Sequence, residues 1–417
     1  MMRSLRVMNT TRIAANVLPS AQRLRIALVT ETYAPEINGV AMTLQRMVHG
    51  LIERGHQIQL VRPRQRKDDQ ANTFAGFEEL LVRGGKLPRY DGLRFGLPAR
   101  TLLELSWTMQ RPDLVHVATE GPLGWSAVTA ARKLRIPVSS DFHTNFDHYS
   151  QHYGIGWLRQ PVTTYLRCFH RRTERTFVPT SALVRELSKQ GYRDLSVIAR
   201  GVDTALYAPI RRDAELRRSW GAADDDVVLA CVGRLAPEKN LALVRRIIAL
   251  IEAQGLSAKM LFVGDGPMRA ELQKSCPNAI FAGIRRGSDL GAHYASADVF
   301  LFPSLTETFG NVTLEAMASG LCVVAYDYAA AKEVISSGVD GLLAPPGDED
   351  CFIESTLRTL QDRNLRKSIA AAARARAAAF SWDCVNDQFS EELLKVWRGA
   401  GKGPSRTGRE WVLQGKN

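Results

Sequence analysis

The 417-residue sequence predicts an α/β fold, and three observations support that class. Short apolar runs of strand length alternate with longer helical patterns, which is typical of parallel β-α-β units. The chain is too long for one ordinary hydrophobic core, so two domains are expected. Its hydrophobic content of 45% is normal for a globular protein. No apolar run reaches the ~18 residues that would predict a membrane-spanning helix.

The first half of the chain begins with a β-α-β pattern around one glycine. Strands are predicted at 24–30 and 58–61, a helix is predicted at 42–54, and the loop before that helix contains Gly39. The loop lacks Gly-x-Gly-x-x-Gly, which argues against a dinucleotide-dependent dehydrogenase. Gly39 would let the backbone approach a phosphate closely, and an ordinary turn glycine is the equal alternative.

One later strand of the first half ends at a histidine. The strand predicted at 137–140 leads into Asp141, Phe142 and His143. Ligands of open α/β sheets bind beyond the carboxyl ends of the strands, so His143 is a candidate site residue. A structural role is the commoner one for a lone histidine. A helix is predicted at 157–175, followed by a strand at 176–181 that ends at a helix cap.

The second half repeats the α/β pattern with charged residues at a strand end. A strand predicted at 227–233 is followed by Arg234 and Lys239, which flank a turn. The planar fork of arginine and the point charge of lysine both suit a diphosphate, and a pair of surface cations is the alternative. Further strand-to-loop units are predicted at 259–267, 280–285, 322–325 and 341–344.

Two carboxylates bracket a predicted helix start. Glu307 lies in the loop after an apolar strand, and Glu315 lies inside the helix that follows. A helix N-terminus favours anions, phosphates above all, and a nucleotide-diphosphate sugar would also offer hydroxyl groups to the carboxylates. Two unrelated surface acids are the alternative. The backbone N–H groups that would face the anion belong to Phe309, Gly310, Asn311 and Val312.

Positive charge is concentrated in the first half of the chain. Residues 1–205 carry 29 Lys and Arg against 17 Asp and Glu, whereas residues 206–417 carry 26 of each. The whole net charge of +12 therefore predicts an anionic surface or partner for the first half, and no motif indicates nucleic acid. Basic and aromatic residues mix at 62–67 and 86–100, which suits a membrane interface as well as it suits a solvated loop.

Neither a metal site nor a disulfide framework is predicted. Asp224, Asp225 and Asp226 are interpreted as a solvated turn, so no metal ion is expected. The scattered cysteines lack metal-ligand spacing and predict small buried side chains in a reducing cytosol. These cysteines are Cys168, Cys231, Cys276, Cys322, Cys351 and Cys384.

In combination these motifs resemble glycosyltransferase family 4, which includes mannosyl-, glucosyl- and sulfoquinovosyltransferases. The resemblance covers roughly residues 24–397 and rests on the order of Gly39, His143, Gly-Arg234-x4-Lys239 and Glu307-x7-Glu315. It implies the GT-B fold, in which two Rossmann-like domains face a cleft.

The resemblance also implies domain boundaries. Residues 23–205 would form the acceptor-side domain and residues 206–380 the nucleotide-sugar domain. Residues 381–398 would form a terminal helix that crosses back to the first domain. We expect residues 1–22 to be a disordered extension without the apolar core of a signal peptide, and residues 399–417 to be a flexible tail.

Roles for the candidate residues follow from the same resemblance. Glu307 would orient sugar hydroxyls and steady positive charge at the anomeric carbon, and His143 would contact the transferred sugar. Retaining chemistry in the family is described as front-face attack, and a double displacement with a carboxylate nucleophile is the rival. The residues expected to bind the donor are Gly39, Arg234, Lys239, Ile284, Phe309, Gly310, Asn311, Val312 and Glu315, with Arg234 and Lys239 on the pyrophosphate, Ile284 at the base and Glu315 on the ribose.

The expected function is metal-independent, retaining transfer of a hexose from a GDP-mannose-type or UDP-glucose-type donor. We expect a membrane glycolipid or diacylglycerol-type acceptor, which would place the protein at the inner face of the cytoplasmic membrane. No cofactor besides the nucleotide-sugar co-substrate is expected. An enzyme that builds polysaccharide or lipopolysaccharide on a soluble or carrier-bound saccharide is the alternative of the same class. A nucleotide-sugar epimerase and a non-catalytic nucleotide-sugar-binding protein are alternatives of other classes. The sequence leaves the nucleotide, sugar, linkage and oligomeric state open.

Overall fold

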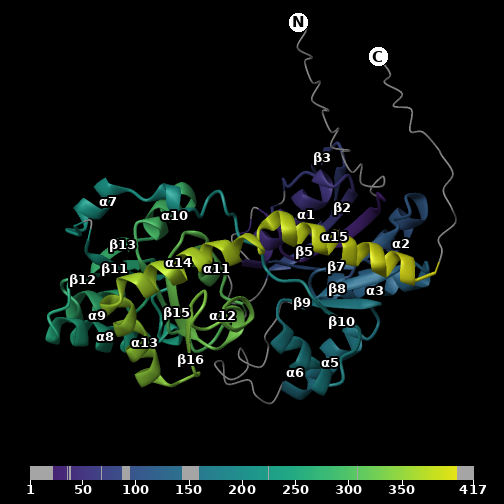
Figure 1. The fold of residues 1–417 in the computed structure, drawn as a ribbon. Helices are drawn as coiled ribbons and strands as arrows, with labels where there is room; N and C mark the ends of the chain where they lie inside the picture. Colours follow the sequence, from purple (N-terminus) through teal and green to yellow (C-terminus); the bar gives the residue numbers. More distant parts are fainter. Residues whose placement is uncertain are drawn as a thin grey trace, which may run out of the picture.

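The computed structural model shows two α/β domains that lie side by side (Figure 1). The structure describes residues 22–34, 36, 39–66, 68–86, 94–142, 159–223, 225–307 and 309–401. The candidate residue His143 and the apolar residues expected at a membrane interface between 87 and 93 lie outside this part of the chain.

The N-terminal domain is built on an eight-stranded sheet of order β10-β9-β8-β7-β1-β2-β4-β3, parallel except for the pair β3–β4. Its strands are β1 (Arg25–Val29), β2 (Gln57–Pro63), β3 (Thr73–Phe74), β4 (Phe77–Val82), β7 (Leu114–Val117), β8 (Val138–Asp141), β9 (Arg175–Val178) and β10 (Leu195–Val197). A separate antiparallel ribbon joins β5 (Gly84–Lys86) to β6 (Arg94–Gly96). The helices are α1 (Gly39–Glu53), α2 (Arg100–Met109), α3 (Pro122–Lys133), α5 (Arg159–His170) and α6 (Ser181–Lys189).

The central strand β1 shows why this half has continuous apolar runs. Ile26 and Leu28 pack into a core shared with α1, whereas Ala27 and Val29 pack into a core shared with α2 and α3. Because helices cover both faces of a parallel sheet, successive residues of a central strand are all buried.

The C-terminal domain is a six-stranded parallel sheet of order β13-β12-β11-β14-β15-β16. Its strands are β11 (Val227–Val232), β12 (Ala258–Val263), β13 (Ile280–Gly283), β14 (Val299–Phe302), β15 (Cys322–Tyr326) and β16 (Leu342–Ala344). The helical segments are η2 (Pro209–Arg211), α7 (Ala214–Ser219), η3 (Pro237–Lys239), α8 (Leu241–Ala253), α9 (Arg269–Ser275), α10 (Gly287–Ala295), α11 (Asn311–Ala318), α12 (Ala329–Val334), α13 (Glu349–Gln361) and α14 (Arg363–Ala378). Two apolar cores lie on the two faces of the sheet, so both domains have a doubly wound arrangement.

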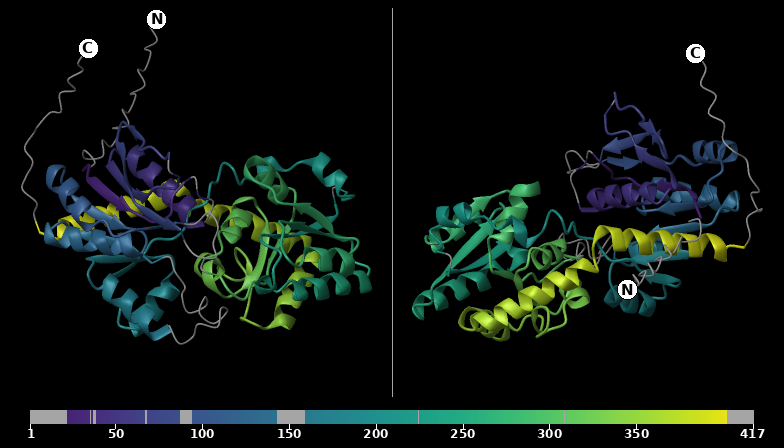
Figure 2. Two further views of the ribbon diagram at one scale, coloured as in Figure 1. Left: turned by 180° about the vertical axis from the view of Figure 1, so that it is seen from behind. Right: turned by 45° about the horizontal axis from the view of Figure 1, so that its top comes forward.

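The last helix, α15 (Trp382–Gly399), lies along the N-terminal domain (Figure 2). Its residues Phe389 and Leu393 join the core of β1 and α1, and a Cβ on Gly50 of α1 would lie 1.9 Å from the side chain of Asn386. The chain therefore passes between the domains twice. The two passages touch where the Val202 backbone N–H donates to the carbonyl of Phe380 over 2.8 Å.

Three local expectations differ from the structure. The sequence predicts one helix over 157–175, whereas the described helix α5 spans Arg159–His170. Arg175, at the end of the predicted helix, instead begins strand β9 of the sheet. The loop expected after the second strand instead contains the hairpin β3–β4 and the ribbon β5–β6. Arg62, expected to be available at a membrane interface, is buried, with ion pairs to Asp69 at 2.7 Å and Glu79 at 2.9 Å. Among the described helices, none is both long and apolar enough to cross a bilayer.

Candidate active site

The candidate site lies at the carboxyl ends of β11 and β14 in the C-terminal sheet. The strand order reverses there, because β12 follows β11 on one side while the later strand β14 lies on the other. Open parallel sheets bind ligands at such a switch point. The loops that contain the predicted charged residues begin at these strand ends. Arg234 follows β11, and Glu307 follows β14.

Lys239 and Glu307 are brought together across this switch point. The ammonium group of Lys239, at the end of η3, forms an ion pair with Glu307 Oε1, and Ser304 Oγ donates to the same oxygen over 2.9 Å. Lys239 Nζ also lies 5.6 Å from the centre of the Phe302 ring. Both charged side chains are mostly buried, so each compensates the desolvation of the other.

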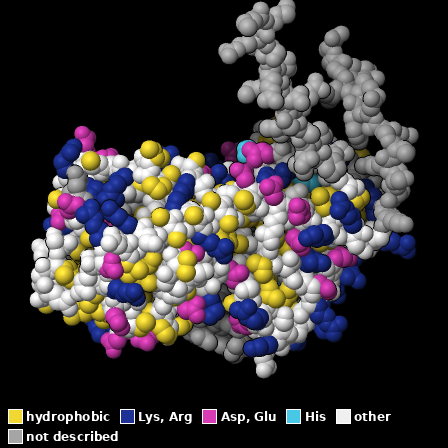
Figure 3. All heavy atoms as spheres, in the orientation of Figure 1, with side chains coloured by type: hydrophobic (Ala, Val, Ile, Leu, Met, Phe, Trp, Pro, Cys, Tyr) yellow, Lys and Arg dark blue, Asp and Glu magenta, His cyan; other side chains and the backbone are white. Residues whose placement is uncertain are grey.

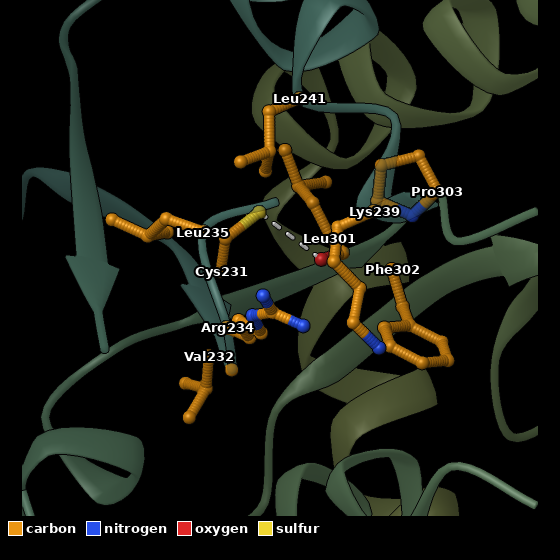
Figure 4. A pocket seen from close by; sticks show the side chains of 10 residues that line it. Cys231, Val232, Arg234, Leu235, Lys239, Leu241, Leu301, Phe302 and Pro303 are labelled. Carbon is orange, nitrogen blue, oxygen red and sulfur yellow. Dashed lines mark hydrogen bonds between the residues drawn. The ribbon is translucent and has the colours of Figure 1, made fainter. Parts of the chain in front are cut away.

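Arg234 has a different environment, although it points into the same space as Lys239 (Figure 4). Its side chain is 69% exposed and lies 3.9 Å from Glu238, its ion-pair partner among the described residues. An exposed surface pair of this length contributes little, so the guanidinium group is available to an anionic ligand.

Two glycines, Gly233 and Gly264, allow the backbone segments that follow β11 and β12 to pack closely next to Arg234. The N–H of Gly233 donates to Val263, and the N–H of Gly264 donates to Gly283, so three neighbouring strand ends are joined. A Cβ on Gly264 would lie 1.9 Å from the carbonyl oxygen of Gly233. Ile284 directly follows β13, the outermost of these three strands, and its side chain is 63% exposed. A ligand bound at these strand ends could therefore contact Ile284.

The N-terminus of α11 supplies backbone donors to the same site. Gly310 precedes the helix with φ of 92°, a conformation that favours glycine, and the first turn contains no acidic residue and no capping side chain. Phe309 is buried, and its carbonyl accepts the N–H of Ala330 over 2.8 Å. The N–H groups of Asn311 and Val312 thus lie in a first helical turn that contains no acidic side chain to balance the positive end of the helix dipole.

Glu315 lies one turn further along α11, and its side chain is partly buried. Its Oε2 accepts the hydroxyl of the fully buried Tyr294 over 2.9 Å, and the hydroxyl of Tyr207 binds the same carboxyl group. Burial raises the pKa of Glu315, and the two tyrosine hydrogen bonds oppose that rise. The carboxyl is therefore held in one orientation by groups that come from α10 and from the segment after the first domain.

Gly39 of the N-terminal domain is the first residue of α1, and no described contact joins it to Arg234, Lys239 or Glu307. A Cβ at Gly39 would meet no atom of the described residues within 4 Å, so packing does not require glycine here. The space in front of α1 is consistent with close approach of a ligand to the backbone. The position of His143 is not described, and its role stays a prediction.

Sequence reasoning missed several side chains that complete this site. Ser304 could have been noticed because it follows a predicted strand directly. Tyr207 and Tyr294 had no local pattern that linked them to Glu315, since they are far from it in sequence. Tyr328, whose hydroxyl donates to the Glu307 carbonyl over 3.3 Å, likewise comes from the end of another strand. Among the described residues, no group of three or more His, Cys, Asp or Glu side chains is arranged to hold a metal ion.

Comparison with known proteins identifies related sequences over both domains. Residues 37–206 match the family profile described as Glycosyltransferase Family 4, and residues 226–362 match the profile described as Glycosyl transferases group 1. A GDP-mannose-dependent alpha-mannosyltransferase of Mycobacterium tuberculosis is 33% identical over 368 residues, which are 88% of this chain and 95% of that protein. An alpha-monoglucosyldiacylglycerol synthase of Streptococcus pneumoniae is 28% identical over 77% of this chain and 75% of that protein.

A solved structure shows the same fold. Sucrose-phosphate synthase of Thermosynechococcus elongatus superposes with a TM-score of 0.72 at 18% identity, and the match covers 90% of this chain and all of that one. This agreement, with the two doubly wound sheets, confirms the expected GT-B architecture of two Rossmann-like domains.

Proposed function

Because the chain belongs to glycosyltransferase family 4, we propose that this glycosyltransferase retains anomeric configuration and moves a hexose from a nucleotide-diphosphate sugar to a membrane lipid. The observation that carries the proposal is the meeting of Lys239, Glu307 and the exposed Arg234 beside the uncapped start of α11. This arrangement places cations and backbone donors next to a carboxylate at one switch point.

The cations and N–H groups suit the leaving diphosphate. Charge that develops on the diphosphate would be met by Arg234 and Lys239, which point into the same space (Figure 4), and by the backbone N–H groups of Asn311 and Val312 at the start of α11. These groups can perform the task without a metal ion. A diphosphate that attracts Lys239 would also weaken its pairing with Glu307, leaving that carboxylate to bind hydroxyl groups of the sugar.

The two carboxylates have separate proposed roles. Glu307, in the loop between β14 and α11, would orient the sugar and stabilise positive charge at the anomeric carbon, and His143 would contact the sugar from the first domain. Glu315, held by two tyrosines, would bind the ribose. The proposed reaction is a front-face attack, in which the leaving phosphate oxygen takes the acceptor proton, and Ser304 would keep its hydrogen bond to Glu307 Oε1.

The donor is proposed to be GDP-mannose or a UDP-glucose-type sugar. The two relatives described above are a GDP-mannose-dependent alpha-mannosyltransferase and an alpha-monoglucosyldiacylglycerol synthase. Binding of both kinds of donor should therefore be compared directly. Thermal unfolding of the chain with GDP, UDP, GDP-mannose and UDP-glucose at equal concentration separates them, since a bound ligand stabilises the folded state by mass action. A single nucleotide should raise the Tm, and a Tm that no nucleotide shifts would contradict the donor site.

An anionic membrane surface is the proposed location of the acceptor. The charge excess of the first half supports this, and Lys and Arg side chains line the edge of the molecule where α2 and α3 lie (Figure 3). The burial of Arg62 moves the proposed contact from the segment 62–67 to α2.

The outer face of α2 exposes a strip of apolar side chains. Leu102, Leu105 and Met109 are 42%, 61% and 78% exposed and follow one another at helical spacing, while Leu103 and Trp107 face the core. At 3.6 residues per turn, Glu104 lies on another side of α2 from these exposed apolar residues. It is paired at 2.7 Å with both Arg100 and Lys133, and these hydrogen bonds lower its pKa. The exposed apolar strip fits a bilayer interface, and the Lys and Arg side chains at this edge of the molecule fit anionic headgroups.

Vesicle binding tests the membrane part of the proposal. We expect the protein to sediment with phosphatidylglycerol-rich vesicles at low salt, less at high salt, and little with phosphatidylcholine alone. Leu105→Ser with Met109→Ser should reduce binding by about 30-fold or more, because each lost apolar side chain removes about 1 kcal/mol or more of burial. Ile210→Ser is the matched control, since Ile210 is 91% exposed on the C-terminal domain. Absence of binding to anionic vesicles, with efficient transfer to a water-soluble saccharide, would favour a polysaccharide-building role.

A further inference from the structure

Helix α12 connects the candidate active site to the other domain. It follows the carboxyl end of β15, and α6 of the N-terminal domain follows the carboxyl end of β9. These two strand-to-helix connections contact each other directly, and Figure 1 shows α12 on the side of its domain nearest to α6. The pair therefore forms a direct link between the domains that does not pass along the chain.

Glu333 of α12 forms that link. Its Oε2 accepts the backbone N–H of Ser181 over 2.9 Å and the Ser181 hydroxyl over 2.8 Å. Ser181 is the first residue of α6, where a negative charge is favourable and charge-assisted hydrogen bonds are strong. Thr180 already caps this helix by accepting the N–H of Leu183 over 3.2 Å. The contact with Glu333 is thus an addition to a helix that has its own cap.

The other end of α12 touches the loop of Glu307. The hydroxyl of Tyr328, just before α12, donates to the backbone carbonyl of Glu307 over 3.3 Å. The N–H of Ala330, in the first turn, donates to the carbonyl of Phe309 over 2.8 Å. A displacement of α12 would therefore pull on the backbone on both sides of the loop that carries the proposed catalytic carboxylate.

We propose that Glu333 is a positioning residue for glycosyl transfer. By binding the start of α6, it fixes the distance between the domains, and through α12 it fixes the loop of Glu307. Apart from Gly39, the residues proposed to bind the donor lie on the C-terminal domain, so loss of the contact should lower turnover more than nucleotide affinity. The inference rests on the proposed site in the C-terminal domain, and it is independent of which sugar or acceptor is used.

Four variants separate this role from a general loss of charge. Glu333→Ala removes both hydrogen bonds, whereas Glu333→Gln keeps a neutral oxygen acceptor and should rescue part of the effect. Glu354→Ala is the matched control, because Glu354 is an exposed residue of α13 for which no hydrogen bond or ion pair with another described residue is found. Ser181→Ala removes one of the two bonds and serves if Glu333→Ala does not fold.

The first measurement is hydrogen exchange of the full chain, followed by mass spectrometry, without any substrate. In Glu333→Ala, amides at the start of α6 and in residues 305–313 should exchange at least about fivefold faster, because both segments lose a restraint. Glu333→Gln should lie between Glu333→Ala and the wild type, and Glu354→Ala should match the wild type. This readout reports on the contact even if the proposed donor or acceptor is wrong.

The second measurement compares nucleotide binding with turnover. The Kd for GDP or UDP, whichever raises the Tm, should change by less than about threefold, whereas release of that nucleotide from its sugar donor should slow at least about tenfold. Faster exchange confined to α6, wild-type turnover in Glu333→Ala, or a loss of nucleotide affinity equal to the loss of turnover would each overturn the proposal.

Discussion

The two domains use their charged residues in opposite ways. In the C-terminal half, which has no net charge, Lys239 and Glu307 meet at strand ends and leave Arg234 exposed beside them. In the N-terminal half, which carries all of the excess charge, Arg62 is buried between two acids, and Arg100 of α2 and Lys133 of α3 both pair with Glu104. Net charge therefore predicts which half would face the proposed anionic partner, but burial and pairing decide which residues could contact it.

The largest expected effect is on the proposed catalytic carboxylate. Glu307→Gln should lower kcat by about 100-fold to 1000-fold, because it removes a charge that acts on the transition state. Its Tm should fall only slightly, since the amide oxygen can still accept from Ser304 and Lys239 although the charge that compensated Lys239 is lost. Steady-state kinetics and thermal unfolding test both statements, with Glu354→Gln as the control. A folded Glu307→Gln enzyme with full activity would remove Glu307 from the mechanism.

The two cations should differ in stability although they share a role. Arg234→Ala and Lys239→Ala should each cost roughly 2–4 kcal/mol in kcat/KM, because each removes a charged contact to the diphosphate. Only Lys239→Ala should also lower the Tm, since it leaves the mostly buried Glu307 without its partner, whereas Arg234 is 69% exposed. Wild-type kcat/KM in either variant would end its assignment as a diphosphate ligand.

The N-terminal domain should show a pH dependence of its own. Burial of Glu31, in the loop after β1, raises its pKa to about 7, and the charge of Glu120 adds to the rise, while the N–H of Leu123 opposes it. Between its ordinary pKa of 4.5 and about 7, the folded state keeps a proton that the unfolded state has lost. The contribution of Glu31 to stability therefore falls as pH rises through that window.

Urea unfolding at pH 5 and pH 8 measures this contribution. Glu31→Gln should be more stable than the wild type by about 2 kcal/mol at pH 8 and nearly equal to it at pH 5. The opposite order, with the variant less stable at pH 8, would show that Glu31 is stabilised as the charged form in the folded protein.

The smallest expected effect is that of a chelator. Because Arg234, Lys239 and the start of α11 are proposed to neutralise the leaving group, excess EDTA should leave the initial rate of transfer unchanged. Loss of activity in EDTA that Mg²⁺ or Mn²⁺ restores would require a metal ion at the diphosphate.

The sequence predicted best what depends on local spacing. Lys239 and Glu307 each follow a predicted strand, and Gly310 stands where a helix must begin, so their approximate placement followed from the pattern. The environment of Arg62 did not, because its burial depends on Asp69, in the segment before β3, and on Glu79 of the β3–β4 hairpin, which the pattern of apolar residues did not indicate. Contacts between distant segments, such as Tyr294 with Glu315 or Glu333 with Ser181, arise only when the elements pack together.

The most direct test of the account is transfer from a labelled donor to lipid in anionic vesicles. The protein is incubated with radiolabelled GDP-mannose or UDP-glucose and vesicles that contain diacylglycerol or a glycolipid, and label is measured in the lipid fraction with the anomeric configuration of the product. The account predicts an α-linked glycolipid, formed with release of the nucleoside diphosphate and lost in Glu307→Gln. Label that enters only a water-soluble saccharide, or a product of inverted configuration, would contradict it.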